Sequence, residues 1–123
     1  MSSEITITGS LRVSNGALVN NYPLPQQSVD MTEGRYSAGV QEIGTSEEAI
    51  SFNAELTAPG WGYFRNLDAT NYVEIGLYKG ATFYPLLKLK PGEWQIVRLA
   101  TTTDVYAKAD TAAVDLEHYL LDD

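Results

Sequence analysis

The residues from Gly60 to Ala109 divide into five short apolar runs, each closed by residues typical of turns. These runs are Tyr63–Leu67, Tyr72–Tyr78, Phe83–Leu89, Trp94–Leu99 and Val105–Ala107. β-Branched and aromatic residues between turns at this spacing predict a meander of antiparallel strands. Lys90-Pro91-Gly92-Glu93 predicts a type II turn, because Pro favours the second position and Gly permits the positive φ of the third. We therefore expect this block to form the core of the fold, with further strands added to it.

Two stretches before the block have the same character. Glu4–Ser14 alternates apolar and polar residues and predicts a strand with one buried face. Asn15-Gly16 follows at once and predicts a tight hairpin, with Ala17–Asn20 as the returning strand.

Further strands are predicted over Ser28–Met31, Tyr36–Ile43 and Ile50–Leu56. The last segment, Ala112–Leu121, fits both a strand and a helical period, and its Val, His and Tyr residues in strict alternation favour the strand. The sequence thus predicts ten or eleven strands and no convincing helix.

The predicted fold class is all-β: a two-sheet antiparallel β-sandwich with jelly-roll-like connections, formed as a single domain over residues 1–123. Asn21–Gln27 contains two prolines and is predicted to cross between the sheets. Ala58–Gly60 is interpreted as a second passage of this kind.

The amino-acid composition argues against several classes of function and partner. The chain has no Cys, no apolar run long enough for a membrane helix, and no basic-then-apolar start typical of a signal peptide. We therefore expect a soluble protein made in the cytoplasm, with no membrane partner. Its net charge of −8 argues against nucleic acid, since phosphate binding needs a basic surface.

The charge is unevenly distributed. Residues 61–100 carry +2, whereas residues 1–60 and 101–123 carry −5 each. An acidic surface that keeps the protein soluble explains this pattern. A near-neutral middle that meets a partner, between acidic flanks facing solvent, explains it too.

No set of residues predicts catalysis, a metal or a cofactor. His118, the only histidine, lies on the apolar face of a predicted strand and is interpreted as a packing residue. Asn66–Asn71 is rich in oxygen ligands but lacks the pattern of a calcium loop, and is interpreted as a turn. Carboxylate pairs for glycoside hydrolysis, Glu47 with Glu48 or Asp104 with Asp110, have no support from spacing. We therefore expect that the protein is not an enzyme.

The aromatic residues are more informative. The segment Gly60–Ala109 contains six large aromatic residues that cannot all be buried in one core of this size: Tyr63, Tyr72, Tyr78, Tyr84, Trp94 and Tyr106. They either cover the second face of a sheet, form a protein–protein interface, or form a platform for sugars.

Four segments carry a resemblance to a known group of proteins. They are Gly39–Ala49, Arg65–Gly76 (RNLDATNYVEIG), Phe83–Glu93 (FYPLLKLKPGE) and Tyr106–Glu117 (YAKADTAAVDLE). Together they span roughly residues 39–121 and resemble small, mostly uncharacterised proteins encoded among the structural genes of tailed bacteriophages. The resemblance implies a virion component and assigns no functional residues.

The expected function is that of a structural virion protein, either a capsid decoration (cement) protein or a tail or neck accessory protein. Its expected partners are copies of itself and the major capsid or tail proteins. The residues expected to form protein contacts are Tyr63, Arg65, Tyr72, Tyr78, Lys79, Tyr84 and Trp94. The alternative is a host-facing carbohydrate- or receptor-binding module that uses Trp61, Asn66 and Asp68.

Overall fold

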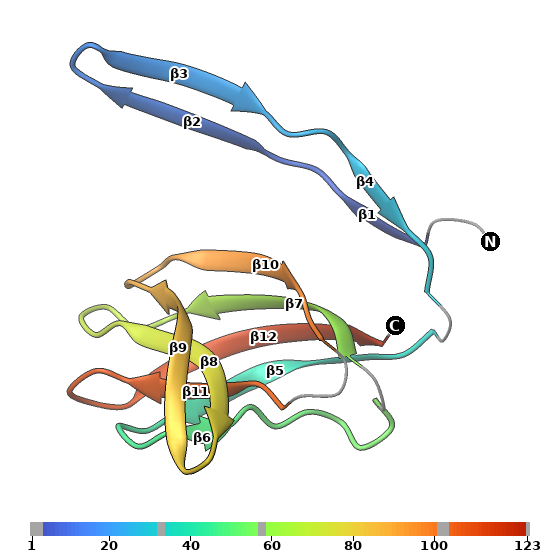
Figure 1. Ribbon diagram of the computed structural model, residues 1–123, viewed down its shortest axis with the longest axis vertical. Coiled ribbons are helices and arrows are strands. Elements are labelled where there is room, and N and C mark those ends of the chain that lie inside the picture. The colour runs from blue at the N-terminus through green and yellow to red at the C-terminus, as the bar shows by residue number, and fades with distance from the viewer. Residues whose placement is uncertain (1–3, 32–33, 57–58, 101–103, 123) are drawn as a thin grey trace. The chain divides into compact units, whose positions relative to one another are not determined.

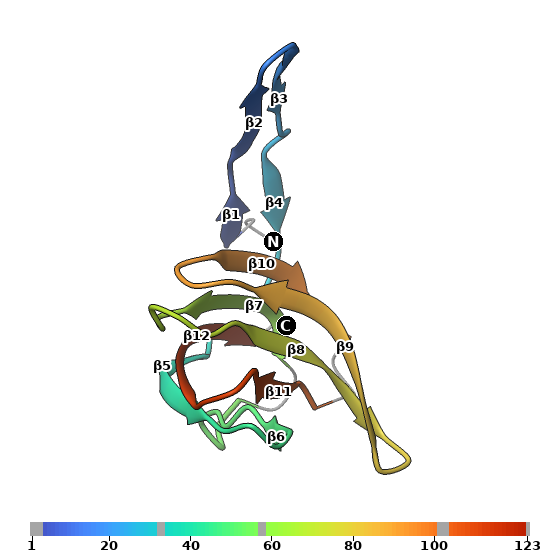
Figure 2. The same cartoon turned by 90° about the vertical axis from the view of Figure 1, so that its left-hand side faces the viewer.

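The computed structural model describes residues 4–31, 34–56, 59–100 and 104–122, and these residues form strands and loops with no helix. The chain divides into two compact units, Met1–Thr32 and Glu33–Asp123. The first unit is a two-stranded ribbon and the second contains two four-stranded sheets (Figures 1 and 2). The predicted all-β sandwich is confirmed, and the second unit forms it.

Twelve strands are present in the described part of the chain. The ribbon contains β1 (Ile5–Ile7), β2 (Ser10–Asn15), β3 (Leu18–Pro23) and β4 (Gln27–Val29). The sandwich contains β5 (Tyr36–Ile43), β6 (Glu48–Ala49), β7 (Pro59–Asn66), β8 (Val73–Lys79), β9 (Thr82–Leu89), β10 (Trp94–Arg98), β11 (Tyr106–Ala109) and β12 (Val114–Asp122).

The sandwich has the strand order of a jelly roll. One sheet runs β10-β7-β12-β5 and the other runs β6-β11-β8-β9, with all pairs antiparallel. The strands pair in reverse order around the β8–β9 turn: β8 with β9, β7 with β10, β6 with β11 and β5 with β12. The second unit is therefore one long hairpin wound over two sheets, the arrangement of two Greek keys that defines this architecture.

The predicted meander is wrong, although its strands are present. Only β8 and β9 pair as sequence neighbours within the block, through a two-residue turn at Gly80-Ala81 where both φ angles are near +60°. The connections β7–β8, β9–β10 and β11–β12 instead cross between sheets. The turn at Lys90–Glu93 has Gly92 at φ +81° and a bond from the Glu93 amide to the Lys90 carbonyl, so the type II turn is confirmed.

The core lies between the two sheets and is aliphatic, with one ring at its centre. Phe64 is fully buried and faces side chains from both sheets, and the neighbouring Gly62 leaves no room for a Cβ beside that ring. The other buried members of this cluster are Ile43, Ile50, Leu56, Val73, Ile75, Leu89, Ala107, Ala109, Val114, Leu116 and Leu120. Strand β12 supplies three of them by strict alternation, which confirms the strand predicted there.

The ribbon confirms the predicted hairpin and corrects two predictions around it. Asn15 pairs with Leu18 across the turn, and Gly16 has φ +58°. The predicted buried face is wrong, because all of β2 and β3 is exposed and only Ile5 of the alternating apolar residues is buried. Asn21–Gln27 does not cross between sheets: it leads from β3 to β4 within the ribbon, where the Leu24 amide donates to the Gly9 carbonyl. The other predicted passage includes Ala58, which lies outside the described residues.

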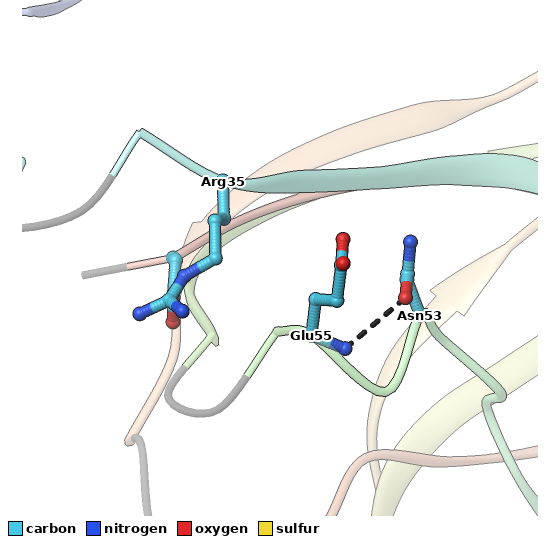
Figure 3. Close-up of polar contacts among 4 residues, drawn as sticks. Arg35, Asn53 and Glu55 are labelled. Carbon is cyan, nitrogen blue, oxygen red and sulfur yellow. Dashed lines mark hydrogen bonds and ion pairs between the residues drawn. The ribbon is translucent and has the colours of Figure 1, made fainter.

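The strand predicted over Ile50–Leu56 is wrong, and this segment is irregular. Apolar and polar residues do alternate here, but three backbone amides of the segment donate to side chains and not to a neighbouring strand. Ser51 N donates to Gln41 Oε1 at 2.7 Å and Asn53 N to Ser37 Oγ at 2.9 Å. Glu55 N donates to Asn53 Oδ1 at 3.1 Å (Figure 3). Only its two ends, Ile50 and Leu56, are buried.

Candidate functional site

The outer side of the sheet β10-β7-β12-β5 presents an aromatic surface. Alternation along β7 turns Gly62 and Phe64 toward the core and Tyr63 and Arg65 outward. The register places Ile96 and Tyr119 on either side of Tyr63. We call Tyr36, Tyr63, Trp94, Ile96 and Tyr119 the aromatic face.

Two ring pairs organise the aromatic face. Tyr36 and Tyr119 are stacked with centroids 5.5 Å apart, and Tyr63 and Trp94 are tilted with centroids 6.2 Å apart. Tyr63 Oη donates to Glu117 Oε1 at 3.4 Å, so polar tips and apolar rings share this surface. Trp94 is 56% exposed and Tyr119 42% exposed, which leaves much of their ring area open to a partner.

The predicted contact residues are divided between the two sheets. Tyr63, Arg65 and Trp94 lie together on β7 and β10, where Trp94 pairs directly with Arg65. The others belong to the opposite sheet or the loop that leads into it: Tyr72, Tyr78, Lys79 and Tyr84. The structure therefore brings three of the seven together.

The other four have their own surroundings. Lys88 Nζ lies 4.0 Å from the Tyr72 ring centroid, and nearby Asp110 raises the pKa of the Tyr72 hydroxyl. Tyr78 stacks on Tyr106 at 5.0 Å. Lys79 and Tyr84 are exposed near the end of the β8–β9 hairpin.

Two members of the aromatic face, Tyr36 and Tyr119, were not among the predicted contact residues. They lie 83 positions apart in the printed sequence and meet only because β5 pairs with β12. The alternation of residues 114–121 places Tyr119 on the polar side with Asp115 and Glu117, and that was the one sequence signal for its exposure.

At one end of the sandwich, a polar network ties the crossings between sheets together. Asn66 is fully buried, and its Nδ2 donates to the carbonyls of Leu89 at 3.0 Å and Asn71 at 2.9 Å. Its Oδ1 accepts from the Asp68 amide at 2.8 Å. A further bond joins Thr111 Oγ1 to Asn71 Oδ1 at 2.8 Å. These bonds occupy the oxygen-rich residues considered for calcium, and the segment is a turn as predicted.

Asp68 holds this turn through its carboxylate. Oδ2 accepts from Asn71 N at 2.6 Å, Thr70 N at 2.9 Å and Thr70 Oγ1 at 3.3 Å. These donors, the Asn71 amide foremost, lower the pKa of Asp68 below its ordinary value of 3.8, because they favour the charged form.

We expect this carboxylate to make the stability of the chain depend on pH. A lowered pKa in the folded state adds stability that is complete above the unfolded value of 3.8 and is lost as pH falls through the folded value. Wild type should exceed Asp68→Asn in urea midpoint at neutral pH, and the difference should shrink in acid below the ordinary carboxyl pKa. A difference that stays constant across this range would show that the charge has no part in it.

His118 lies on the inner side of β12 opposite Phe64, consistent with a packing residue. Within the part of the chain that the structure describes, its Nδ1 is buried and has no hydrogen-bond partner. Burial lowers the pKa of the imidazole, because it disfavours the charged form.

The structure gives no geometric support to a carboxylate pair for glycoside hydrolysis or to a metal site among the described residues. Glu48 accepts from Gly44 N at 2.9 Å and from Gln41 Nε2 at 3.2 Å, and so holds the turn before β6. Within residues 4–31, 34–56, 59–100 and 104–122, no group of three or more His, Asp or Glu side chains is placed to hold a metal. The same residues contain no helix that is long and apolar enough to span a membrane.

The residues considered for a glycan groove do not lie on one surface. Trp61 and Asn66 are both buried, and they point to opposite sides of β7. The Arg98 guanidinium covers the Trp61 ring at 5.5 Å from its centroid.

Comparisons of the chain with protein-family models, with curated proteins and with solved structures find no match.

Proposed function

We propose that the chain is a structural component of a tailed-phage virion that acts by self-association and by docking on other virion proteins, without catalysing a reaction. A capsid decoration protein and a tail or neck accessory protein both fit this role. The major capsid protein or the tail proteins would be its partners, and the virion its location.

The aromatic face is the observation that carries the proposal. Tyr, Trp and Arg are enriched at protein interfaces, and here they share one sheet face with Arg65 beside Trp94. An open sheet face, with a hollow of about 340 Å³ beside Tyr63 and Tyr119, suits a partner with a broad surface. Virion proteins meet many such surfaces because their partners repeat symmetrically.

The segments that resemble phage structural proteins include four connections between the two sheets. Residues 44–47, 67–72, 90–93 and 110–113 join strands of opposite sheets and belong to the four segments. The resemblance thus covers residues that fix the jelly-roll winding. Viral capsid and lectin domains both use this architecture, so the fold permits the proposed role, and the aromatic face favours protein over sugar.

Binding to phage particles tests the proposal. Empty capsids and tails from the phage that encodes the chain should each be sedimented with the purified protein. We expect saturable binding to one of them, and about tenfold weaker binding for Tyr119→Ser, because removal of a central interface aromatic costs 1–2 kcal/mol or more.

Tyr78→Ser is the matched control, because Tyr78 is one of the four expected contact residues that lie outside the aromatic face. Tyr78 is also one ring of a stacked tyrosine pair and is 37% exposed, but it lies on the opposite sheet. It should bind about as well as wild type, within roughly twofold. No binding of wild type to either particle, or equal losses for both variants, would contradict the proposal.

A further inference from the structure

The ribbon presents one apolar face. Leu11 pairs with Tyr22, Val13 with Asn20 and Asn15 with Leu18. Directly opposed residues share a face, so Leu11, Val13, Leu18 and Tyr22 lie on one side. We call these four residues the ribbon face. Their exposed fractions are 65%, 39%, 58% and 62%.

A ribbon of this kind is incomplete by itself. Two-stranded hairpins are at best marginally stable in water, and among the described strands β2 and β3 pair only with each other. An exposed apolar surface such as the ribbon face is therefore expected to pack against another apolar surface.

The described part of the sandwich has an apolar groove. It has a volume of about 380 Å³, lies between β8–β9 and β10, and is lined chiefly by Leu77, Leu86, Leu87, Val97, Leu99 and Val105. A register shift in the β8–β9 pair causes part of it. Ile75 pairs with Leu87 and Gly76 with Pro85, which leaves Leu86 unpaired and 73% exposed.

We propose that the ribbon face of one copy packs into this groove of a second copy. The inference rests on the self-association included in the proposed function and names the surfaces that perform it. The unit Met1–Thr32 carries −1, from Glu4, Asp30 and Arg12, whereas residues 33–123 carry −7 from fourteen acidic and seven basic side chains. Like charge therefore opposes contact between two sandwiches much more than contact between a ribbon and a sandwich.

This pairing joins two different surfaces, so each copy keeps a free ribbon and a free groove for the next. Such head-to-tail contacts close into rings when the rotation permits. The groove and the aromatic face share no residue, so this self-association uses a different surface of the sandwich from the proposed virion contact.

The absence of Cys from the chain permits a direct test by disulfide formation. Full-length Leu18→Cys and Leu86→Cys, carrying tags of different mass, are mixed and oxidised. We expect mixed disulfide dimers to form about tenfold or more above either variant alone, because docking raises the local thiol concentration. Val19→Cys, equally exposed but on the other side of the ribbon, should not couple to Leu86→Cys above that background.

The other outcomes overturn the inference in distinct ways. Dimers of Leu18→Cys alone at the same yield would mean that ribbon packs on ribbon. A link within one chain of the Leu18→Cys/Leu86→Cys double variant, with no mixed dimers, would mean that each ribbon covers its own groove. Oligomers of wild type without mixed dimers would refute the inference alone. A wild-type monomer that also fails to bind phage particles would refute the proposed function as well.

Discussion

Asn66→Ala is expected to lower the free energy of unfolding by about 3 kcal/mol, which corresponds to a fall of roughly 15 °C in melting temperature. Asn66 is fully buried and makes three hydrogen bonds to the backbone, with Leu89, Asn71 and Asp68. Alanine leaves a buried carbonyl of β9 without this donor and opens a cavity beside it. Each unsatisfied buried group costs about 1–3 kcal/mol, so the loss exceeds that of an ordinary surface change.

Urea unfolding measures this loss, with Asn21→Ala as the control. Asn21 is an exposed residue of the ribbon, and its removal should change stability by no more than about 0.5 kcal/mol. Asn66→Asp keeps the size of the side chain but turns an oxygen toward two carbonyls, so it should be as damaging as alanine. If either Asn66 variant lost less than about 1 kcal/mol, the network would not hold the crossings together.

Gly76→Ala is expected to have the larger effect. A Cβ at this position would clash with the Tyr84 carbonyl oxygen and lie 2.8 Å from Pro85 Cα, both backbone atoms of the paired strand. No rotamer change relieves a clash with backbone, so β8 and β9 must separate at the point where their register shifts. We expect a loss of more than about 3 kcal/mol and little folded protein at 37 °C.

Gly39→Ala is the matched control because it makes the same change in another strand. The nearest atom to its added Cβ would be His118 Cε1 at 3.9 Å, an ordinary contact. Circular dichroism and urea unfolding should show a folded Gly39→Ala protein close to wild type and a disrupted Gly76→Ala protein. A stable Gly76→Ala protein would mean that the two strands do not approach as closely as the structure places them.

Local pattern was enough to predict most strands. Tyr36–Ile43 has the same bounds in the sequence prediction and in the structure, and the turns at Gly16 and Gly92 follow from residues that tolerate positive φ. Ile50–Leu56 failed because its amides bond to the side chains of Gln41, Ser37 and Asn53, which alternation does not reveal.

Which strands pair with each other could not be predicted from the sequence and is known only from the three-dimensional structure. Adjacent runs in the sequence were predicted to pair as a meander, whereas β7 pairs with β10 and β12 and none of its partners is a sequence neighbour. The aromatic face depends on those distant pairings. Tyr63 and Trp94 were predicted as contact residues from composition, but Tyr36 and Tyr119 join them only through the β5–β12 and β7–β12 registers.

Quantitative mass spectrometry of purified virions addresses the proposed role most directly. Particles of the phage proposed to encode the chain would be banded by density, separated into heads and tails, and compared with a lysate of the same infection. We predict that the chain is enriched in one fraction, at a copy number in a fixed ratio to the major capsid or tail protein. A chain that is abundant in the lysate but absent from both fractions would contradict the virion role.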